Sequence, residues 1–261
     1  MRLLWNRLFS PVPRVRRLGQ FHEKAGSEAQ YLAGRNSRFK ELIRLVRISM
    51  EFFRGMRALH RVGPSITVFG SARFKEDHPF YQLGLQVGRV LGREGFTVIT
   101  GGGPGIMEAA NRGAKEAGGR TIGCNIRLPL EQAPNPYLDQ VVTFYYFFVR
   151  KVMLVKYSYG FVILPGGFGT LDETMEAITL IQTGKLYDFP VILMGVDYWK
   201  GFLSWMESVL VKNGTIAAQD LKFLHLTDDA EEAIRIILHT TQGLGGLGVR
   251  PPNEKSTIDR K

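Results

Sequence analysis

Residues 161–181 read FVILPGGFGTLDETMEAITLI, and this stretch decides the fold. Its first four residues are all apolar, which is typical of a short strand buried on both faces of a parallel sheet. A glycine-rich turn follows at 165–170, and the spacing of apolar residues over 171–183 predicts a helix. The stretch therefore predicts a buried strand that leads through a glycine turn into a helix, which is half of a βαβ unit.

The same alternation of short apolar strands and longer helices continues on both sides of this stretch. We expect further strands at 66–70, 96–100, 121–125, 141–143 and 191–194, and helices at 79–93, 104–117, 145–158, 198–212 and 229–239. Strands that alternate with helices of this length indicate βαβ units on a parallel sheet. The pattern predicts a single doubly wound α/β domain over residues 62–240.

Two flanking regions differ from this domain. Residues 37–60 have the apolar spacing of a helix, and Gly63 and Pro64 stop the pattern, so residues 1–61 are interpreted as a basic arm and a helical extension. The sequence from 242 onward is marked by glycine and proline, and we expect residues 241–261 to be a disordered tail.

The net charge of +10 comes entirely from the N-terminal region. Residues 1–61 hold fourteen basic and four acidic residues, whereas residues 62–261 hold twenty of each. A solvated arm is one interpretation of this excess. Contact of residues 1–61 with nucleic acid, an anionic surface or a neighbouring subunit is the alternative. An organellar transit peptide also fits the arginine-rich composition, but Pro11 and Pro13 would break its amphipathic helix.

The composition argues against several classes of protein. No stretch approaches the 18 consecutive apolar residues of a membrane-spanning helix, so we expect a cytoplasmic protein. The single cysteine, Cys124, excludes an internal disulfide and a multi-cysteine metal site. The five histidines are scattered and argue against a zinc centre, and we expect no metal and no cofactor.

Two glycine-rich turns follow predicted strands, TGGGPGIM at 100–107 and PGGFGT at 165–170. Glycines let the backbone approach a ligand, and the free N–H groups at a helix start suit phosphate. We expect Pro104 and Thr170 to begin and cap the two helices. Because ligands of such sheets bind at the carboxyl ends of the strands, the turns predict a nucleotide-phosphate site, with tight helix-on-strand packing as the alternative.

Two common nucleotide motifs are absent. A GxGxxG fingerprint that starts at Gly101 would need glycine where Ile106 stands, and no GxxxxGK[ST] occurs. The sequence therefore argues against NAD binding and against a P-loop ATPase.

An acidic and a basic residue are candidates for chemistry beside this site. Arg150 interrupts the apolar run 142–155, where a charge needs a partner or a ligand, and Glu173 follows the second turn. We expect Arg150 to face Glu173, to orient it and to keep it ionised. In N-glycosidic cleavage positive charge develops at C1′ of the ribose. An ionised carboxylate can stabilise that charge, hold ribose hydroxyls or polarise water.

The strings GGGPGIMEAANRGA (101–114) and PGGFGTLDE (165–173), with RKVM at 150–153 between them, closely resemble the LOG family. This "lonely guy" or lysine-decarboxylase-like Rossmann family contains cytokinin riboside 5′-monophosphate phosphoribohydrolases. The resemblance covers about residues 64–240. It implies a Rossmann-like fold and hydrolysis of a nucleoside 5′-monophosphate, of AMP or cytokinin riboside type, to free base and ribose 5-phosphate. The alternative is a protein of this fold that binds a nucleotide or cofactor without turnover.

The resemblance also implies roles for individual residues. Arg150 and Glu173 match the family's catalytic pair. The matching positions for phosphate and nucleotide contacts are Ser71, Gly102, Gly103, Met107, Lys151, Gly166, Gly167, Gly169 and Thr170.

The resemblance implies a homodimer or a hexamer, and the longer members with an N-terminal helical extension tend towards hexamers. Phe148 and Val149 stand where the shorter plant-type members have a polar pair, so the preferred base is not fixed. A decarboxylase would need a Schiff-base lysine, and none of the chain's lysines is a clear candidate.

Overall fold

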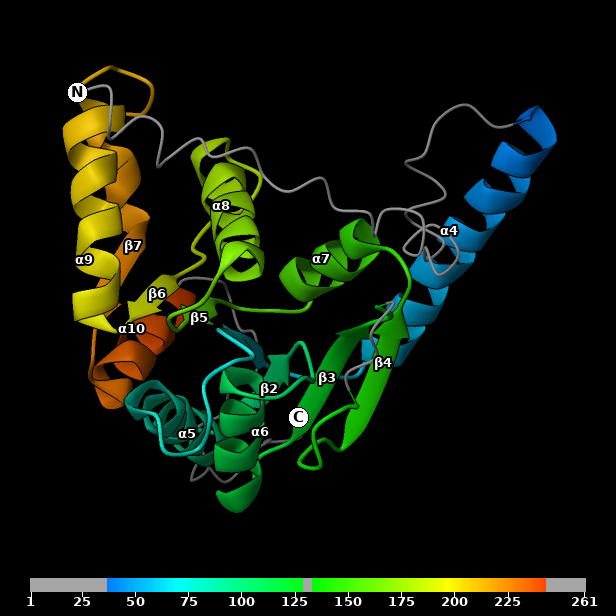
Figure 1. Cartoon of the computed structure of the whole chain (residues 1–261), viewed down its shortest axis with the longest axis horizontal. Helices are drawn as coiled ribbons and strands as arrows, with labels where there is room; N and C mark the ends of the chain where they lie inside the picture. Colours follow the sequence, from blue (N-terminus) through cyan, green and yellow to red (C-terminus); the bar gives the residue numbers. More distant parts are fainter. Residues whose placement is uncertain (1–36, 129–132, 243–261) are drawn as a thin grey trace, which may run out of the picture.

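The computed structural model of the chain describes residues 37–128 and 133–242. A parallel sheet of seven strands lies at its centre, in the order β4-β3-β2-β1-β5-β6-β7 (Figure 1). The strands are β1 Ser65–Phe69, β2 Thr97–Thr100, β3 Thr121–Ile126, β4 Gln140–Phe144, β5 Phe161–Ile163, β6 Val191–Met194 and β7 Leu224–Thr227. The predicted doubly wound, Rossmann-like α/β fold is confirmed.

The order of the strands reverses at the middle of the sheet. The chain builds outward from β1 to β4, then returns so that β5 pairs with β1 on its other side, with Val68 opposite Val162. The carboxyl ends of β1 and β5 therefore flank the position where a doubly wound sheet binds its ligand.

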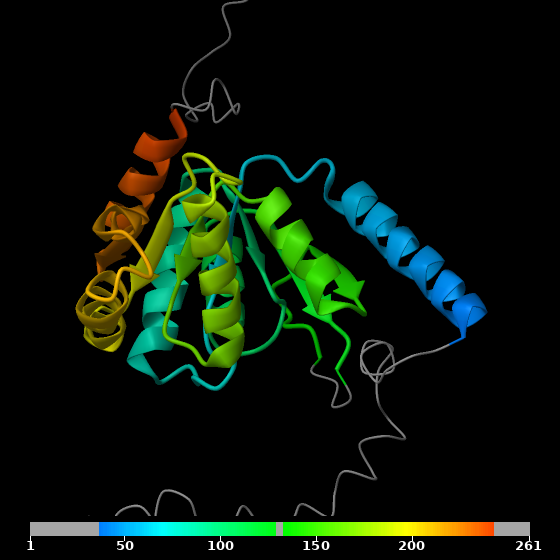
Figure 2. The ribbon, with the colours of Figure 1, turned by 90° about the horizontal axis from the view of Figure 1, so that it is seen from above.

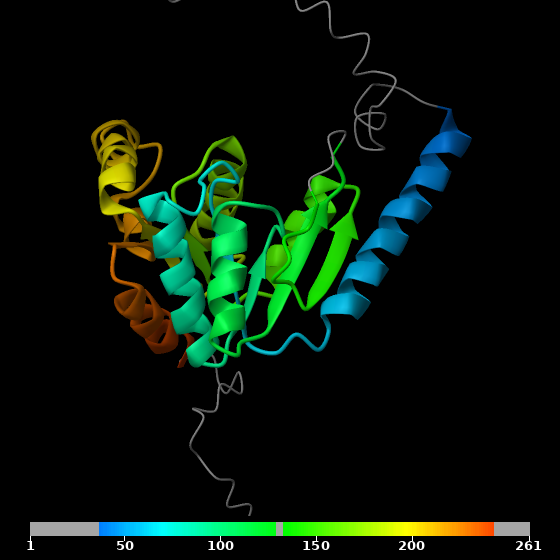
Figure 3. The same cartoon turned by 60° about the horizontal axis from the view of Figure 1, so that its bottom comes forward.

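Helices cover both faces of the sheet. α5 (Pro79–Arg93), α6 (Ile106–Glu116) and α10 (Ala230–Gln242) lie on one face, with α5 and α6 in front of the sheet in Figure 3. α7 (Phe147–Lys156), α8 (Phe168–Gln182) and α9 (Val196–Trp205) cover the other face (Figure 1).

Each central strand supplies apolar side chains to both faces, because successive side chains of a strand point to opposite sides. Val98 and Val162 belong to the core under α5, α6 and α10. Their neighbours Ile99 and Ile163 belong to the core under α7, α8 and α9. This two-sided burial explains why these strands are continuous apolar runs.

The predicted helical extension is α4 (Arg38–Leu59), which lies beyond the edge strand β4 and beside α7 (Figures 1 and 2). Its second half is packed closely on the domain. A Cβ at Gly55 would lie 2.9 Å from Phe144 Cε1, so glycine allows the close approach. Gln140 Nε2 also donates a hydrogen bond of 3.1 Å to the carbonyl of Ala58.

Several boundaries differ from the sequence expectations. β7 and the 3₁₀ turn η2 (Ala218–Phe223) were not expected. The helix expected at 198–212 is α9 followed by a π-helical segment, η1 (Met206–Val211). α10 continues to Gln242, so residues 241 and 242, which were expected to begin the disordered tail, are helical. The predictions for residues 1–36 and 243–261 lie outside the described residues. Within the described residues no helix is both long and apolar enough to cross a bilayer.

Candidate functional site

A cleft of about 710 Å³ opens at the carboxyl ends of β1 and β5. Its walls come from the turn after β1, from the start of α7, and from the turn and first residues of α8. The cleft therefore lies at the reversal of strand order, where the sequence predicts a nucleotide site.

The turn after β1 connects the two glycine-rich turns. The N–H of Ser71 donates to the Pro165 carbonyl, and the Ser71 carbonyl accepts from Ile106 N–H, both at 3.0 Å. Gly105 has a φ of +69°, and a Cβ there would collide with the Ser71 carbonyl oxygen. Gly105 is the N-cap of α6, so the expectation that Pro104 begins this helix is wrong: the sharp turn at Gly105 delays its start.

The second glycine-rich turn leads into α8 earlier than expected. Gly167 is the N-cap and Thr170 lies inside the first turn without capping it, so the expected cap by Thr170 is wrong. The Thr170 hydroxyl instead packs against Gly166, where a Cβ would collide with Oγ1. A Cβ at Gly167 or Gly169 would meet only open space, and both line the cleft. The uncapped N–H groups of a first helical turn are free for an anionic ligand.

Arg150 and Glu173 meet at the base of the cleft. Arg150 Nη2 lies 3.2 Å from Glu173 Oε1, and the two residues are 8% and 9% exposed. Arg150 Nε also donates a hydrogen bond of 3.0 Å to the Cys124 carbonyl. A Cβ at Gly101 would lie 3.1 Å from Nη2, so glycine there makes room for the guanidinium. The expected facing of the two side chains is confirmed, while their catalytic role stays a prediction.

The protonation state of Glu173 differs from the expectation. Burial raises the pKa of this carboxyl to about 7, although the positive charges of Arg150 and Lys151 lower it. Arg150 favours the ionised form, as expected, but burial outweighs its effect, so the expectation that Arg150 keeps the carboxylate ionised holds only in part near neutral pH. A carboxyl that titrates near the working pH can both hold and release a proton.

Six of the predicted nucleotide contacts line this cleft together with Arg150 and Glu173. They are Ser71, Met107, Gly166, Gly167, Gly169 and Thr170. The structure therefore brings eight of the eleven predicted site residues into one cleft.

Gly102, Gly103 and Lys151 are not among the lining residues. The carbonyls of Gly102 and Gly103 accept hydrogen bonds from Asn135, from its backbone N–H at 2.9 Å and from its Nδ2 at 3.1 Å. The two carbonyls therefore hold the segment at Asn135 against the first turn, and the nucleotide contacts expected of these glycines stay a prediction. Lys151 Nζ lies 3.2 Å from Asp172 and 2.9 Å from Glu176.

Among the cleft residues that sequence reasoning missed are Arg73, Phe147, Phe168 and Tyr198. Phe168 is 93% exposed, and an aromatic side chain between the glycines of a turn was the signal that it is not core. Arg73 is exposed, and its N–H donates to Ser71 Oγ at 3.1 Å. Aromatic faces can stack on a planar base, and a guanidinium can pair with phosphate.

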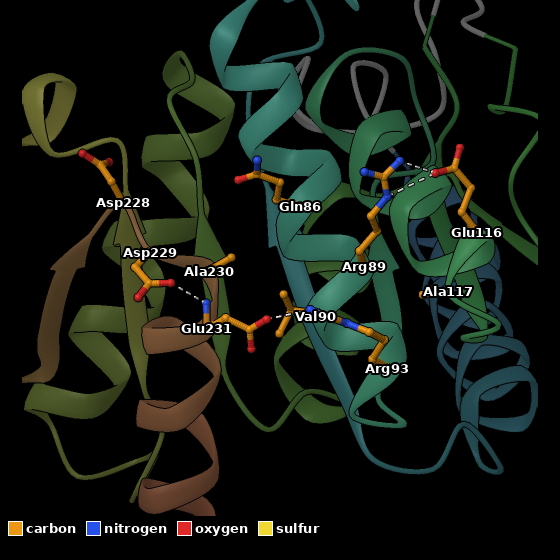
Figure 4. A pocket seen from close by; sticks show the side chains of 10 residues that line it. All are labelled: Gln86, Arg89, Val90, Arg93, Glu116, Ala117, Asp228, Asp229, Ala230 and Glu231. Atoms are coloured by element: carbon orange, nitrogen blue, oxygen red, sulfur yellow. Dashed lines mark hydrogen bonds and ion pairs between the residues drawn. The ribbon is translucent and has the colours of Figure 1, made fainter.

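A second pocket, of about 500 Å³, lies between α5 and the start of α10 (Figure 4). Its charged groups already pair with each other, Arg89 with Glu116 at 2.7 Å and Arg93 with Glu231 at 2.6 Å. Asp228 Oδ1 accepts the N–H groups of residues 195 and 196 at the start of α9. The cleft at β1 and β5 is therefore the better candidate for the functional site.

In the described part of the chain no three His, Cys, Asp or Glu side chains form a metal-binding group.

Comparison with known proteins shows which family this chain resembles. The sequence model of a family described as possible lysine decarboxylase matches residues 107–237. The cytokinin riboside 5′-monophosphate phosphoribohydrolase of Mycobacterium tuberculosis is 29% identical over 159 residues, which are 59% of this chain and 83% of that protein. The rice enzyme of the same name, LOG (Oryza sativa subsp. japonica), is 28% identical over 169 residues, 63% and 68% of the two chains.

Solved structures with this fold include cofactor-binding proteins. The molybdenum cofactor binding protein of Rippkaea orientalis has a TM-score of 0.50 at 26% identity, over 68% of this chain and 96% of its own. The Moco carrier protein of Chlamydomonas reinhardtii has a TM-score of 0.51 at 25% identity, over 69% and 99%.

Proposed function

Because the chain belongs to the LOG family, the family whose sequence model is described as possible lysine decarboxylase, we propose that it is a phosphoribohydrolase. It hydrolyses the N-glycosidic bond of a nucleoside 5′-monophosphate, of AMP or cytokinin riboside type, and releases the free base and ribose 5-phosphate. The observation that carries this proposal is the buried pair of Arg150 and Glu173 beside the first turn of α8. The names of the curated relatives support the same reaction class.

In this proposal the 5′-phosphate binds at the start of α8. The N–H groups of residues 167–170 and the positive end of the helix dipole favour an anion there. Arg73, a cation in the lining of the same cleft, supplies a charged donor to the phosphate oxygens. The phosphate then fixes the ribose over Glu173.

The chemical step breaks the bond from C1′ to the base nitrogen, whose electron pair leaves with the base and takes up a proton from solvent water. Ionised Glu173 stabilises the positive charge that develops at C1′ and accepts a proton from the attacking water. The water oxygen forms the new bond to C1′, which completes ribose 5-phosphate. Arg150 holds the carboxylate towards the cleft through the contact of 3.2 Å.

The decarboxylase description of the family does not fit this cleft. Pyridoxal phosphate chemistry needs a lysine that forms a Schiff base. Among the described residues that line the cleft, none is a lysine. Lys151, the nearest in sequence to Arg150, lies in ion pairs with Asp172 and Glu176.

A cofactor or nucleotide carrier is the second candidate, favoured by the solved structures named as molybdenum cofactor binding and carrier proteins. A carrier would use the same cleft without breaking a bond. Incubation with AMP, GMP, CMP and N6-isopentenyl-AMP, followed by chromatography, separates the two. Release of free base from a monophosphate supports the hydrolase, and tight calorimetric binding with no free base from any of them contradicts it.

We expect hydrolysis to depend on pH through Glu173. Its pKa of about 7 lies above the ordinary carboxyl value, and the active form is ionised. The rate constant kcat/KM should fall about tenfold per pH unit below 7 and level off above it. The substrate phosphate also ionises, near pH 6, so the pH dependence of ribose 5-phosphate binding is the control. A rate that does not change between pH 5.5 and 8 contradicts the assignment.

We also propose that copies of this chain assemble, as a homodimer or a hexamer, through the exposed apolar surface of α4. The large apolar side chains exposed on α4 are Phe39, Leu42, Ile43, Leu45, Val46, Met50, Phe53 and Met56. A monomeric protein rarely exposes so much contiguous apolar surface. Exposed Tyr145 lines a pocket with Met50 and Phe53 of α4, and exposed Phe147, two residues further on, lines the cleft, which favours a second copy seated beside the site.

This assembly predicts the effect of a charge on α4. Phe53→Asp should convert the oligomer to a monomer, because an aspartate would be buried without a partner in the interface. Light scattering coupled to size-exclusion chromatography measures the mass. Tyr187→Asp, at an exposed aromatic residue before β6, is the control and should leave the mass unchanged. A parent that is already monomeric, or a Phe53→Asp variant with the parent's mass, contradicts the proposal.

A further inference from the structure

Glu51 is a buried carboxylate on the N-terminal helix, outside the cleft. It is 5% exposed, and one of its oxygens, Oε1, accepts the backbone N–H groups of Tyr145 at 2.9 Å and Tyr146 at 3.1 Å. These residues form the turn between β4 and α7, and Tyr146 is the N-cap of α7. The carboxylate therefore satisfies two N–H groups at the start of α7, where the helix dipole favours negative charge.

This turn is one helical turn away from Arg150. The carbonyl of Tyr146, the N-cap residue, accepts a hydrogen bond of 3.1 Å from the backbone N–H of Arg150, four residues further on. The side chain of Arg150 then reaches the Cys124 carbonyl and Glu173. A continuous chain of contacts thus leads from Glu51 to the pair at the base of the cleft.

Two neighbours of Glu51 fix α4 at the same place. Arg54 Nη2 donates to the carbonyl of Thr143 at 2.8 Å. At Gly55 a Cβ would lie 3.1 Å from Met153 Cγ on α7, so glycine lets the two helices approach closely. The three residues 51, 54 and 55 lie on about one turn of α4, and all lie against α7 or the end of β4 and the turn after it. Figure 1 shows α4 beside β4 and α7.

We propose that Glu51 is a positioning residue for the reaction, which holds the first turn of α7 so that Arg150 lies against Glu173. This inference rests on the proposed function for its kinetic readout. It gives the N-terminal helix a part in the site, although no residue of α4 lines the cleft.

The test compares Glu51→Ala with Glu51→Gln in the full chain. Glutamine keeps an oxygen that can accept both N–H groups, whereas alanine leaves them without this acceptor. We expect alanine to lower kcat about tenfold or more with KM nearly unchanged, because a small misplacement of a catalytic group costs this much. Glutamine should restore most of kcat. Gln140→Ala removes another contact between β4 and α4 and should leave kcat unchanged.

A readout without turnover separates this proposal from the proposed function. The carboxyl carbon of Glu173 can be titrated by NMR in protein with labelled glutamate, and its signal is identified by its absence in Glu173→Gln. Burial raises its midpoint most, and the charges that act on it are Arg150 and Lys151 on α7 and Asp172 and Glu176 on α8.

Because the charge of Arg150 favours the ionised form of Glu173, the Glu51→Ala variant should titrate at higher pH than the parent. Glu51→Gln should titrate like the parent. If Glu51→Ala lowers only the melting temperature and leaves the midpoint and kcat at the parent values, Glu51 is merely structural and the proposal is overturned. A Glu51→Gln variant as impaired as Glu51→Ala also overturns it. If the parent protein releases no base, the proposed function fails, and the NMR midpoints of the parent and the two Glu51 variants alone decide whether Glu51 positions Arg150.

Discussion

Glu173→Gln should lower kcat for nucleoside 5′-monophosphate hydrolysis by about 10²–10⁴-fold, the range of general acid–base groups. The amide has the size of the carboxyl, so the cleft keeps its shape and KM should change little. It carries no charge to stabilise C1′ and accepts no proton from water. Arg150 keeps its hydrogen bond to the Cys124 carbonyl in this variant, so the fold around the pair should persist.

The matched control for this variant lies on the same helix. Glu176 is partly exposed, pairs with Lys151 at 2.9 Å and does not line the cleft. Glu176→Gln makes the same chemical change one helical turn away and should retain the parent's kcat. Both variants are assayed for free base by chromatography at pH 8, where Glu173 of the parent is ionised. A Glu173→Gln variant that keeps more than a tenth of the parent's rate contradicts the assigned role.

Arg150→Ala should lower kcat/KM by about 10²–10³-fold, the loss typical for one electrostatic group of an active site. Two effects add. The carboxylate loses the group that holds it towards the ribose, and the pKa of Glu173 rises further because the positive charge that lowers it is gone. The acidic limb of the pH profile should therefore move to higher pH.

The same variant predicts a change of stability with pH. The folded-state pKa of Glu173 lies above its unfolded value, so its ionisation in the folded protein destabilises the fold as pH rises from the unfolded value through the folded one. Without Arg150 this loss should be larger, and urea unfolding at pH 5.5 and 8.5 measures it. Lys156→Ala, at an exposed position of α7, is the control. An equal stability difference between the two pH values in parent and Arg150→Ala contradicts the account.

The fold was largely predictable because its central strands are buried on both faces. The runs 161–164 and 191–194 are continuously apolar and bounded by glycine or proline, a pattern with few other interpretations. The strand β7 was not predicted. It pairs with β6 alone, at the edge of the sheet, and its four residues LHLT are mostly half-buried. An edge strand of this length needs little apolar character, so its sequence resembles a loop.

The site was predictable where the glycine turns and the charged residues shared one edge of the sheet. The facing of Arg150 and Glu173 follows from that topology, whereas the pKa of the carboxyl does not. It depends on how deeply packing buries the pair, for instance on the room that Gly101 leaves for the guanidinium. The contact from Glu51 to residues 145 and 146 could not be predicted from the sequence either. It forms only because α4 packs against a turn that lies 94 residues further along the chain.

The central claim is that one cleft holds the phosphate at the start of α8 and the ribose at Glu173. A crystal structure of the Glu173→Gln variant soaked with AMP tests it most directly. The account predicts phosphate oxygens on the N–H groups of residues 167–170, and C1′ within direct or one-water reach of residue 173. A nucleotide bound in the other pocket, beside Arg89 and Arg93, or bound in the cleft with its base rather than its ribose at residue 173, contradicts it.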